Sequence, residues 1–278
     1  MRGLSTLARM TGVDTLPEIE KSAAAAQTLG DVIYAQRQGA LTPECEWSDL
    51  VRRAAAGELS ALHGLYERAG RLVFVLALRI TGSRAAADEV TVEVFAGVWR
   101  RAWAYEPAVG TVLAWIMNQA RTRAREHVRY ATSSSGEVHA AGPQSSDSLA
   151  PAISVQSRLA RRIADQDGTE PAPPPPAQWG EPPWETVAQG ISCKLLANDT
   201  ERGRVSMLVR LEPGVDYPPH THAGLEELHL LDGEVCIDAR KLHPGDYNRA
   251  EAASTDNRVW SERGCTCVLI TSTADKLL

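Results

Sequence analysis

The sequence lacks any long apolar run, and this absence limits what the protein can be. No stretch approaches the roughly 20 consecutive apolar residues that are needed to cross a bilayer. Residues 1–12 contain two arginines but no apolar segment long enough for the core of a signal peptide. With 44% apolar and 23% charged residues, the composition is that of a globular protein. We therefore predict a cytoplasmic protein without a membrane partner.

Cysteine is scarce as well, with 5 residues among 278. An odd number of scattered cysteines does not form the disulfide framework of a small secreted domain, so we expect reduced thiols. Cys265 and Cys267 lie two apart in a segment of β type, so their side chains would share one face. Such a pair is a candidate thiol or metal site, but buried cysteine is also an ordinary core residue, which is the interpretation we favour.

The net charge of −6 is unevenly distributed along the chain. Residues 51–130 carry 12 Arg against 7 Asp and Glu, a net charge of +5, whereas residues 131–278 carry 13 basic against 21 acidic residues, a net charge of −8. A basic block in an acidic chain indicates an anionic partner or merely a solvated helical surface, and charge alone leaves both open. If the partner is DNA, we expect the acidic half to compete with it for the basic block.

A chain of 278 residues is long enough for two domains, since one core serves roughly 100 to 200 residues. The changes in composition predict α + β structure in separate domains, an N-terminal helical bundle and a C-terminal double-stranded β-barrel. The expected parts are a leader, partly helical or flexible, at 1–45, a helical domain at 46–131, a Pro- and Ser-rich linker with room for a short helix at 132–183, and a β domain at 184–278.

The two domains differ in the period of their apolar residues. Residues 47–130 show helical spacing, which Gly57 and Gly82 divide into three or four helices, and Ser83 is a good N-cap for the helix that follows it. The last hundred residues instead show short alternating runs separated by turns. Six or more short strands of this kind predict an all-β barrel or sandwich.

The β domain contains a segment with the spacing of a metal site. In GVDYPPHTHAGLEELHLLDG, which covers 214–233, His220 and His222 lie two apart, so on a strand both imidazoles point to one side. Glu226 follows after a turn and supplies an anionic oxygen. Two histidines and a carboxylate suit zinc or, with open positions, ferrous iron or manganese. We therefore predict one divalent metal ion, with zinc preferred; the alternative is two surface histidines on an edge strand.

This segment, including its two bounding glycines, resembles the first motif of the cupins. The turn His243-Pro-Gly-Asp246 resembles the start of the second cupin motif, which in that family continues to a histidine ligand. Here Asp256 stands near the position of that histidine, and it is either the fourth ligand or no ligand at all. His243 and His229 are also close in the sequence, but we expect both to be structural.

The segment RVWSERGCTCVLITS at 258–272, together with the cupin motif, resembles the cupin-like domain of ChrR-type anti-sigma factors. The resemblance implies a zinc-binding barrel that senses an oxidative signal for an attached sigma-binding domain. It also implies that another sigma or anti-sigma protein is a candidate partner.

The helical domain, over about 47–130, is similar to region 2 of the extracytoplasmic-function sigma factors. The pattern is distributed over the segment DLVRRAAAGELSALHGLYERAGRLVFVLALRITGSRAAADEVTVEVFAGVWRRAWAYEP. The resemblance implies that the helix at 85–101 contacts RNA polymerase core. The residues implied for this surface are Asp88, Glu89, Glu93 and Trp99.

The resemblance also implies that residues 103–125 meet promoter DNA. The residue types agree, because melted DNA needs aromatic surfaces for unstacked bases and cations for phosphates. The implied DNA-binding residues are Arg100, Arg101, Trp103, Tyr105, Arg121, Arg123 and Arg125. For Trp99 and Trp115 we favour a place in the core, and for the arginines we favour phosphate contact.

A complete sigma factor of this family has a second helical domain, and the segment at 131–183 is too short and proline-rich to hold one. Three function classes follow. The favoured one is a sigma-like transcription regulator that binds polymerase core and promoter DNA and is modulated by a metal-binding cupin. The others are an anti-sigma-type regulator that binds another transcription protein, and a metal-dependent cupin enzyme such as an oxygenase, although we expect no enzyme activity.

Overall fold

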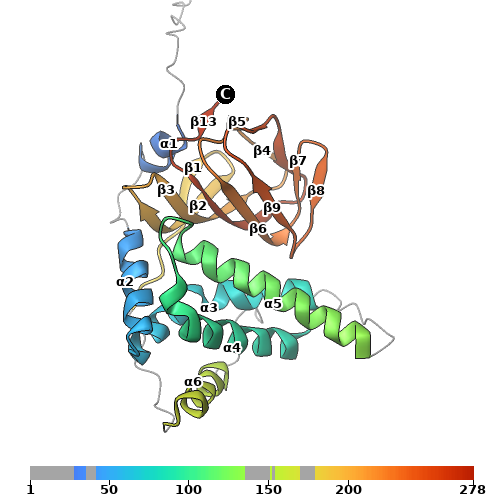
Figure 1. Ribbon diagram of the computed structural model, residues 1–278. Helices are drawn as coiled ribbons and strands as arrows, with labels where there is room; N and C mark the ends of the chain where they lie inside the picture. The colour runs from blue at the N-terminus through green and yellow to red at the C-terminus, as the bar shows by residue number, and fades with distance from the viewer. Residues whose placement is uncertain (1–27, 36–41, 135–150, 152–153, 170–178) are drawn as a thin grey trace, which may run out of the picture.

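The computed structural model describes residues 28–35, 42–134, 151, 154–169 and 179–278. Most of the predicted leader and much of the predicted linker therefore lie outside the described residues. In the part that is described, a helical layer lies directly beneath a β layer (Figure 1). No helix among these residues is long and apolar enough to cross a membrane.

The helical layer follows the breaks that the sequence indicates. Gly82 ends the long third helix in the left-handed region, with φ 66°, where glycine is favoured. Ser83 then caps the next helix by accepting a hydrogen bond from the backbone N–H of Ala86. The elements of this layer are α2 (Glu44–Ala55), α3 (Leu59–Thr81), α4 (Arg84–Arg101), the short 3-10 helix η1 (Ala102–Ala104) and α5 (Val112–Ser134).

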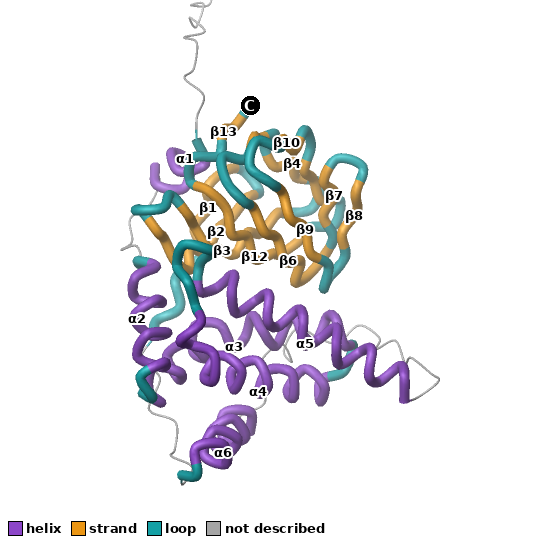
Figure 2. The backbone as a smooth tube through the Cα atoms, in the orientation of Figure 1, coloured by secondary structure: helices purple, strands orange, loops and turns teal. Residues whose placement is uncertain are grey.

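The β layer has one main sheet of six strands in the order β1-β2-β3-β12-β6-β9, with smaller sheets in the orders β10-β5-β13 and β4-β11-β7-β8. The sheets form an open rather than fully closed barrel (Figure 2). The strands are β1 (Glu185–Ala188), β2 (Ile191–Asp199), β3 (Arg204–Leu211), β4 (Val215–Tyr217), β5 (His220–Thr221), β6 (Glu226–Gly233), β7 (Val235–Ile237), β8 (Arg240–Leu242), β9 (Tyr247–Ala250), β10 (Thr255–Asp256), β11 (Val259–Ser261), β12 (Cys265–Ser272) and β13 (Lys276–Leu277).

The main sheet is buried on both faces. On β6 and β12, Leu228 and Cys267 belong to the core inside the β layer, whereas Leu231 and Val268 belong to a core shared with the helices. Side chains alternate along a strand, so one sheet serves two cores. Central strands of this kind read as nearly continuous apolar runs, as in CTCVLITS. The helical and β parts therefore meet in one of these cores, and the other lies inside the β layer.

Two further helices join these layers. α1 (Leu29–Ala35) packs on the β layer, where the backbone N–H of Leu29 donates to the carbonyl of Asp275 at 2.8 Å. α6 (Ser154–Asp167), within the predicted linker, lies beneath α4 and buries Leu159 and Ile163 in the helical core (Figure 1). The expected fold class, a helical part followed by a β-barrel part, is confirmed, with the barrel open rather than closed.

Candidate metal centre

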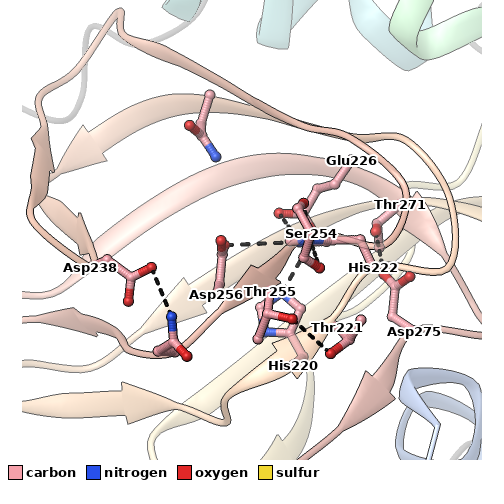
Figure 3. A network of polar contacts seen from close by, with 12 residues as sticks. His220, Thr221, His222, Glu226, Asp238, Ser254, Thr255, Asp256, Thr271 and Asp275 are labelled. Carbon is pink, nitrogen blue, oxygen red and sulfur yellow. Dashed lines mark hydrogen bonds and ion pairs between the residues drawn. The ribbon is translucent and has the colours of Figure 1, made fainter.

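The predicted metal ligands meet at one end of the β layer (Figure 3). His220 lies on β5, His222 follows that strand directly, and Glu226 begins β6. Asp256 reaches the same point because β10 pairs antiparallel with β5, which places Asp256 opposite His220. The candidate ligand atoms of the four residues lie within 4.8 Å of one another, and all four side chains are buried. The structure thus brings together every residue that the sequence nominated for the metal.

The histidine rings are oriented with Nε2 toward the carboxylates. His220 Nδ1 lies 3.0 Å from the carbonyl oxygen of Pro218, and His222 Nδ1 lies 3.1 Å from that of Ser254. A carbonyl only accepts, so Nδ1 carries a proton and Nε2 is the ring nitrogen that faces the carboxylates. A second contact that fixes the other ring nitrogen is the usual support of a metal-binding imidazole. Nε2 of His222 is buried and has no hydrogen-bond partner.

The carboxylates complete a compact, negatively charged donor set. Nε2 of His222 lies 3.5 Å from Glu226 Oε1 and 3.9 Å from Asp256 Oδ2, and Nε2 of His220 lies 3.9 Å from Glu226 Oε2. Burial alone would lower the pKa of His222, but Glu226 and Asp256 outweigh it and raise this pKa to about 9. Burial raises the pKa of Asp256. Carboxylates gathered in a buried site repel each other unless a cation neutralises them.

This donor set fits a divalent metal ion. Two imidazoles and one or two carboxylates satisfy zinc, and the same ligands also suit iron or manganese. Asp275, which the sequence gave no reason to single out, supports the loop by accepting a hydrogen bond from the N–H of Ala223 at 2.7 Å and another from the Thr271 hydroxyl. Tyr217 packs edge-on against His220, with ring centroids 5.4 Å apart. No motif marks these two supporting residues, because only the fold brings them to the site.

The space next to the donors is small and apolar. It measures about 30 Å³ and is lined by residues such as Val209, Leu228, Cys265 and Cys267. Both cysteines are buried in the inner core, and burial raises the pKa of Cys265 to about 11. A space of this size holds roughly one water molecule. Within the described residues, His243 lies apart from the metal cluster, and its side chain is exposed.

The predicted polymerase surface on α4 is partly in contact with α6. Asp88 is buried, and Glu89 forms ion pairs with Arg158 and Arg162 of α6. The indole N–H of Trp99 donates to Asp167 at the end of α6, at 3.1 Å. Glu93 is half-buried. The covering of this surface by α6 depends on tertiary packing, and no local pattern in the sequence announces it.

The predicted DNA-binding residues divide into exposed and engaged groups. Trp103 is 77% exposed, and the side chains of Arg100 and Arg125 are also exposed. Trp103 and Arg100 still donate to backbone carbonyls of their own segment, and the remaining four are less exposed and contact other side chains or the backbone: Arg101 bonds Gln119, Tyr105 packs on Trp115 and donates to the carbonyl of Gly110, Arg121 stacks on Tyr247, and Arg123 pairs with Glu126. Trp99 and Trp115 are partly buried against the helical core.

Comparison with known proteins gives a separate result for each half. The family model described as sigma-70 region 2 matches residues 65–133, and that of the ChrR cupin-like domain matches 177–274. Among similar proteins are the ECF RNA polymerase sigma factors SigK of Mycobacterium sp. (strain KMS), 31% identical over 80 residues, and of Mycolicibacterium vanbaalenii, 32% identical over 84 residues. These matches cover 29% and 30% of this chain and only 42% and 43% of the relatives.

Solved structures similar to the β layer include cupins of low sequence identity. A cupin protein from Ralstonia eutropha is 19% identical, with a TM-score of 0.31, over 32% of this chain and 62% of that one. An acetylacetone dioxygenase from Acinetobacter johnsonii is 12% identical, with a TM-score of 0.32, over 36% of this chain and 77% of that one. One family match falls within the helical half of the structure, from α3 to α5, and the other covers the β half from β1 to β12. The chain thus matches the model of sigma-70 region 2 in its helical half and the model of the ChrR cupin-like domain in its β half, as the sequence patterns predict.

Proposed function

We propose that this protein is a sigma-like transcription regulator of the cytoplasm, which binds RNA polymerase core and promoter DNA and is modulated by its metal-binding cupin. The observation that carries the proposal is the presence of both matches in one chain, at 65–133 and 177–274. A shared core supports it further, because Val268 and Ile270 of the cupin pack in the same cluster as the helices. A change in the cupin can therefore reach the helical segment through direct contacts.

The surfaces of the helical segment suit this role. The exposed indole of Trp103 offers a stacking platform for an unpaired base, and Arg100 and Arg125 offer cations for phosphates. The affinity for single-stranded DNA should fall with salt, with each phosphate contact contributing about 0.7 to the slope of log affinity against log salt. Replacing Arg100 and Arg125 with Gln should flatten this slope. An unchanged slope would exclude them from the DNA contact.

The metal is proposed as zinc, held by His220, His222, Glu226 and Asp256. The buried, unbonded Nε2 of His222 and the two nearby carboxylates support a dication at this point. Elemental analysis of protein purified without added metal tests this directly. We expect about one equivalent of zinc per chain. Iron or manganese could bind through the same four residues, but the chemistry by which the site responds to a signal would then differ.

An anti-sigma-type role is the second candidate, and α6 is the observation that favours it. Glu89 and Trp99 contact α6, so the implied polymerase surface is partly covered by the chain itself. Capture of polymerase core by the full chain distinguishes the two candidates. Charge reversal at Asp88 and Glu89 should weaken capture if α4 binds core. Capture that is absent, or unchanged by the reversal, would favour binding to another transcription protein.

A metal-dependent enzyme fits the structure less well. The space beside the donor cluster is about 30 Å³, whereas sites for small ligands usually enclose roughly 300 to 1,000 Å³. The side chains that line it are mostly apolar and offer few groups to orient a substrate. Consumption of dioxygen by the metal-loaded protein in the presence of candidate substrates would contradict the regulatory proposal.

A further inference from the structure

One surface of the cupin holds the helix to which the proposed function assigns DNA binding. The outer face of β6 and β9 presents Glu227 and Tyr247 toward α5. The side-chain amide of Asn118 donates to Glu227 Oε1 at 2.8 Å, and the hydroxyl of Tyr247 donates to the same oxygen at 2.7 Å. The guanidinium of Arg121 lies 4.0 Å from the centre of the Tyr247 ring. We call Glu227, His229 and Tyr247 the outer-face cluster.

The outer-face cluster is withdrawn from water. His229 is 0% exposed, and its ring lies 4.9 Å from that of Tyr247, between centroids. Burial, with the nearby charge of Arg121, lowers the pKa of His229 to about 3, so the ring is neutral at pH 7. A neutral ring allows Arg121 to stack beside it without repulsion between two cations. The cation beside the cluster is Arg121 of α5.

Docking leaves Arg121 only partly satisfied. Its Nε is buried without a hydrogen-bond partner, and its contact with the cupin is through the face of the Tyr247 ring. The side-chain oxygen of Asn118 is also buried and unbonded. A nucleic-acid phosphate would give Arg121 charge-assisted hydrogen bonds that the ring does not provide. In the docked arrangement, Arg121 and Asn118 thus make fewer hydrogen bonds than a nucleic-acid strand could offer them.

The cupin and a nucleic-acid strand would approach the same side chains of α5. Arg121 lies at the junction of α5 and the sheet, with its face on Tyr247 and its Nε buried, so the β layer occupies space beside this guanidinium. Arg125 stays exposed on the same helix, so the docked form keeps part of the basic surface and loses the rest. We propose that the outer-face cluster of the cupin is a docking surface for α5 that competes with single-stranded DNA for Arg121 and Asn118. This inference rests on the proposed function.

Substitution of Tyr247 in the full chain tests the competition. Tyr247→Leu removes the ring under Arg121 and the hydroxyl on Glu227 while keeping an apolar side chain. We expect it to tighten the binding of a fluorescent single-stranded oligonucleotide of mixed sequence by about three- to tenfold, the scale of a partly desolvated cation–π contact. Adding Arg121→Ala should remove the gain. Glu227→Gln, a milder change that keeps an acceptor oxygen, should move affinity in the same direction by less.

Trp260→Leu is the matched control, because it removes a similar contact, with Arg258 at 4.3 Å, on a sheet away from α5. It should leave DNA binding unchanged. Hydrogen exchange of peptides from 112–134 and 226–250 shows whether the docked contact has opened. Faster exchange in Tyr247→Leu without tighter DNA binding would overturn the competition, as would no change in either. If no variant binds DNA, even with polymerase core, both this inference and the proposed function are wrong.

Discussion

Two consecutive glutamates on β6 have opposite surroundings, and the difference separates a ligand site from a docking surface. Glu226 points into the β layer, where it faces His220 and His222 at 3.9 and 3.5 Å. Glu227 points outward and accepts two hydrogen bonds, from Asn118 and Tyr247. On the inner face two imidazoles and two carboxylates converge on one point, whereas on the outer face Glu227 is hydrogen-bonded to α5 and β9, although Nε of Arg121 and the ring nitrogens of His229 are buried without partners. Convergent ligand atoms fit a cation, and hydrogen bonds between separate elements join two parts of the chain.

The largest effect should come from removing the inner donors. With both His220→Ala and His222→Ala, metal content should fall from about one equivalent per chain to none, because two of the ligands are lost. Asp256→Ala should cause a milder loss. Elemental analysis after gel filtration measures all three proteins.

The matched control for this experiment is His243→Ala, since His243 is exposed and stands apart from the cluster. It should retain the metal fully. Retention by the double variant would show that the ion, if present, binds elsewhere. An unchanged metal content in Asp256→Ala would assign the fourth position to water or to another residue.

Much of the inner site could be predicted from the sequence, because its ligands follow a local rule. The two-residue spacing of His220 and His222 places both on one side of a strand, and Glu226 lies within the next turn. Asp256 needed more than spacing: only the pairing of β10 with β5 brings it opposite His220. The helical and β halves were also predictable, since each has its own apolar period.

The outer face could not be predicted in the same way. Alternation along the strand indicates that His229 points outward, but it does not say what covers it. Glu227, Tyr247 and Asn118 belong to three elements and are unremarkable in their local sequence. Their contact depends on how α5 packs on the sheet, and local sequence does not determine this tertiary packing. The covering of α4 by α6 was missed for the same reason.

A second prediction links the two faces through β6. Metal binding at Glu226 should stabilise the folded chain, by about 2.7 kcal/mol when free metal is 100-fold above its dissociation constant. Part of this gain should appear on the outer face, because Glu226 and Glu227 share one strand. We expect slower hydrogen exchange in peptides from 226–233 and 112–134 when zinc is added. Zinc that raises the melting temperature but leaves both peptides unchanged would show that the two faces are independent.

A third effect concerns the buried His229. Its pKa is about 3 in the folded chain against 6.5 in an ordinary histidine, so the unfolded chain takes up the proton first. The contribution to stability is complete above pH 6.5 and is lost as the pH falls towards 3, with a slope of up to about 1.4 kcal/mol per pH unit. His229→Leu should remove this slope and, because the ring makes no hydrogen bond, should not destabilise the protein at pH 7.

The measurement is the free energy of unfolding by urea between pH 4 and 7, compared at ~1 unit steps. His243→Leu, at an exposed position, is the control and should keep the slope of the parent protein. All of these proteins retain the proposed metal ligands. The titration of those ligands therefore cancels when the pH slopes of the unfolding free energy are compared between proteins. The same slope in parent and His229→Leu would show that His229 gains access to water or to a proton acceptor in solution.

The smallest effect is expected for a carboxylate that forms ion pairs at an exposed position. Glu89 pairs with Arg158 and Arg162 of α6, and these side chains are 37% to 41% exposed, unlike the buried Glu227. Exposed ion pairs contribute only about 0.2 to 1 kcal/mol, so Arg158→Gln should speed hydrogen exchange in 154–167 by no more than about fivefold. Arg161→Gln is the matched control, because Arg161 is exposed on the same helix. Equal effects of the two substitutions on exchange would mean that helix propensity, and not the ion pair with Glu89, stabilises α6. A much larger effect of Arg158→Gln would mean that this ion pair stabilises the fold as strongly as the contacts of the outer-face cluster.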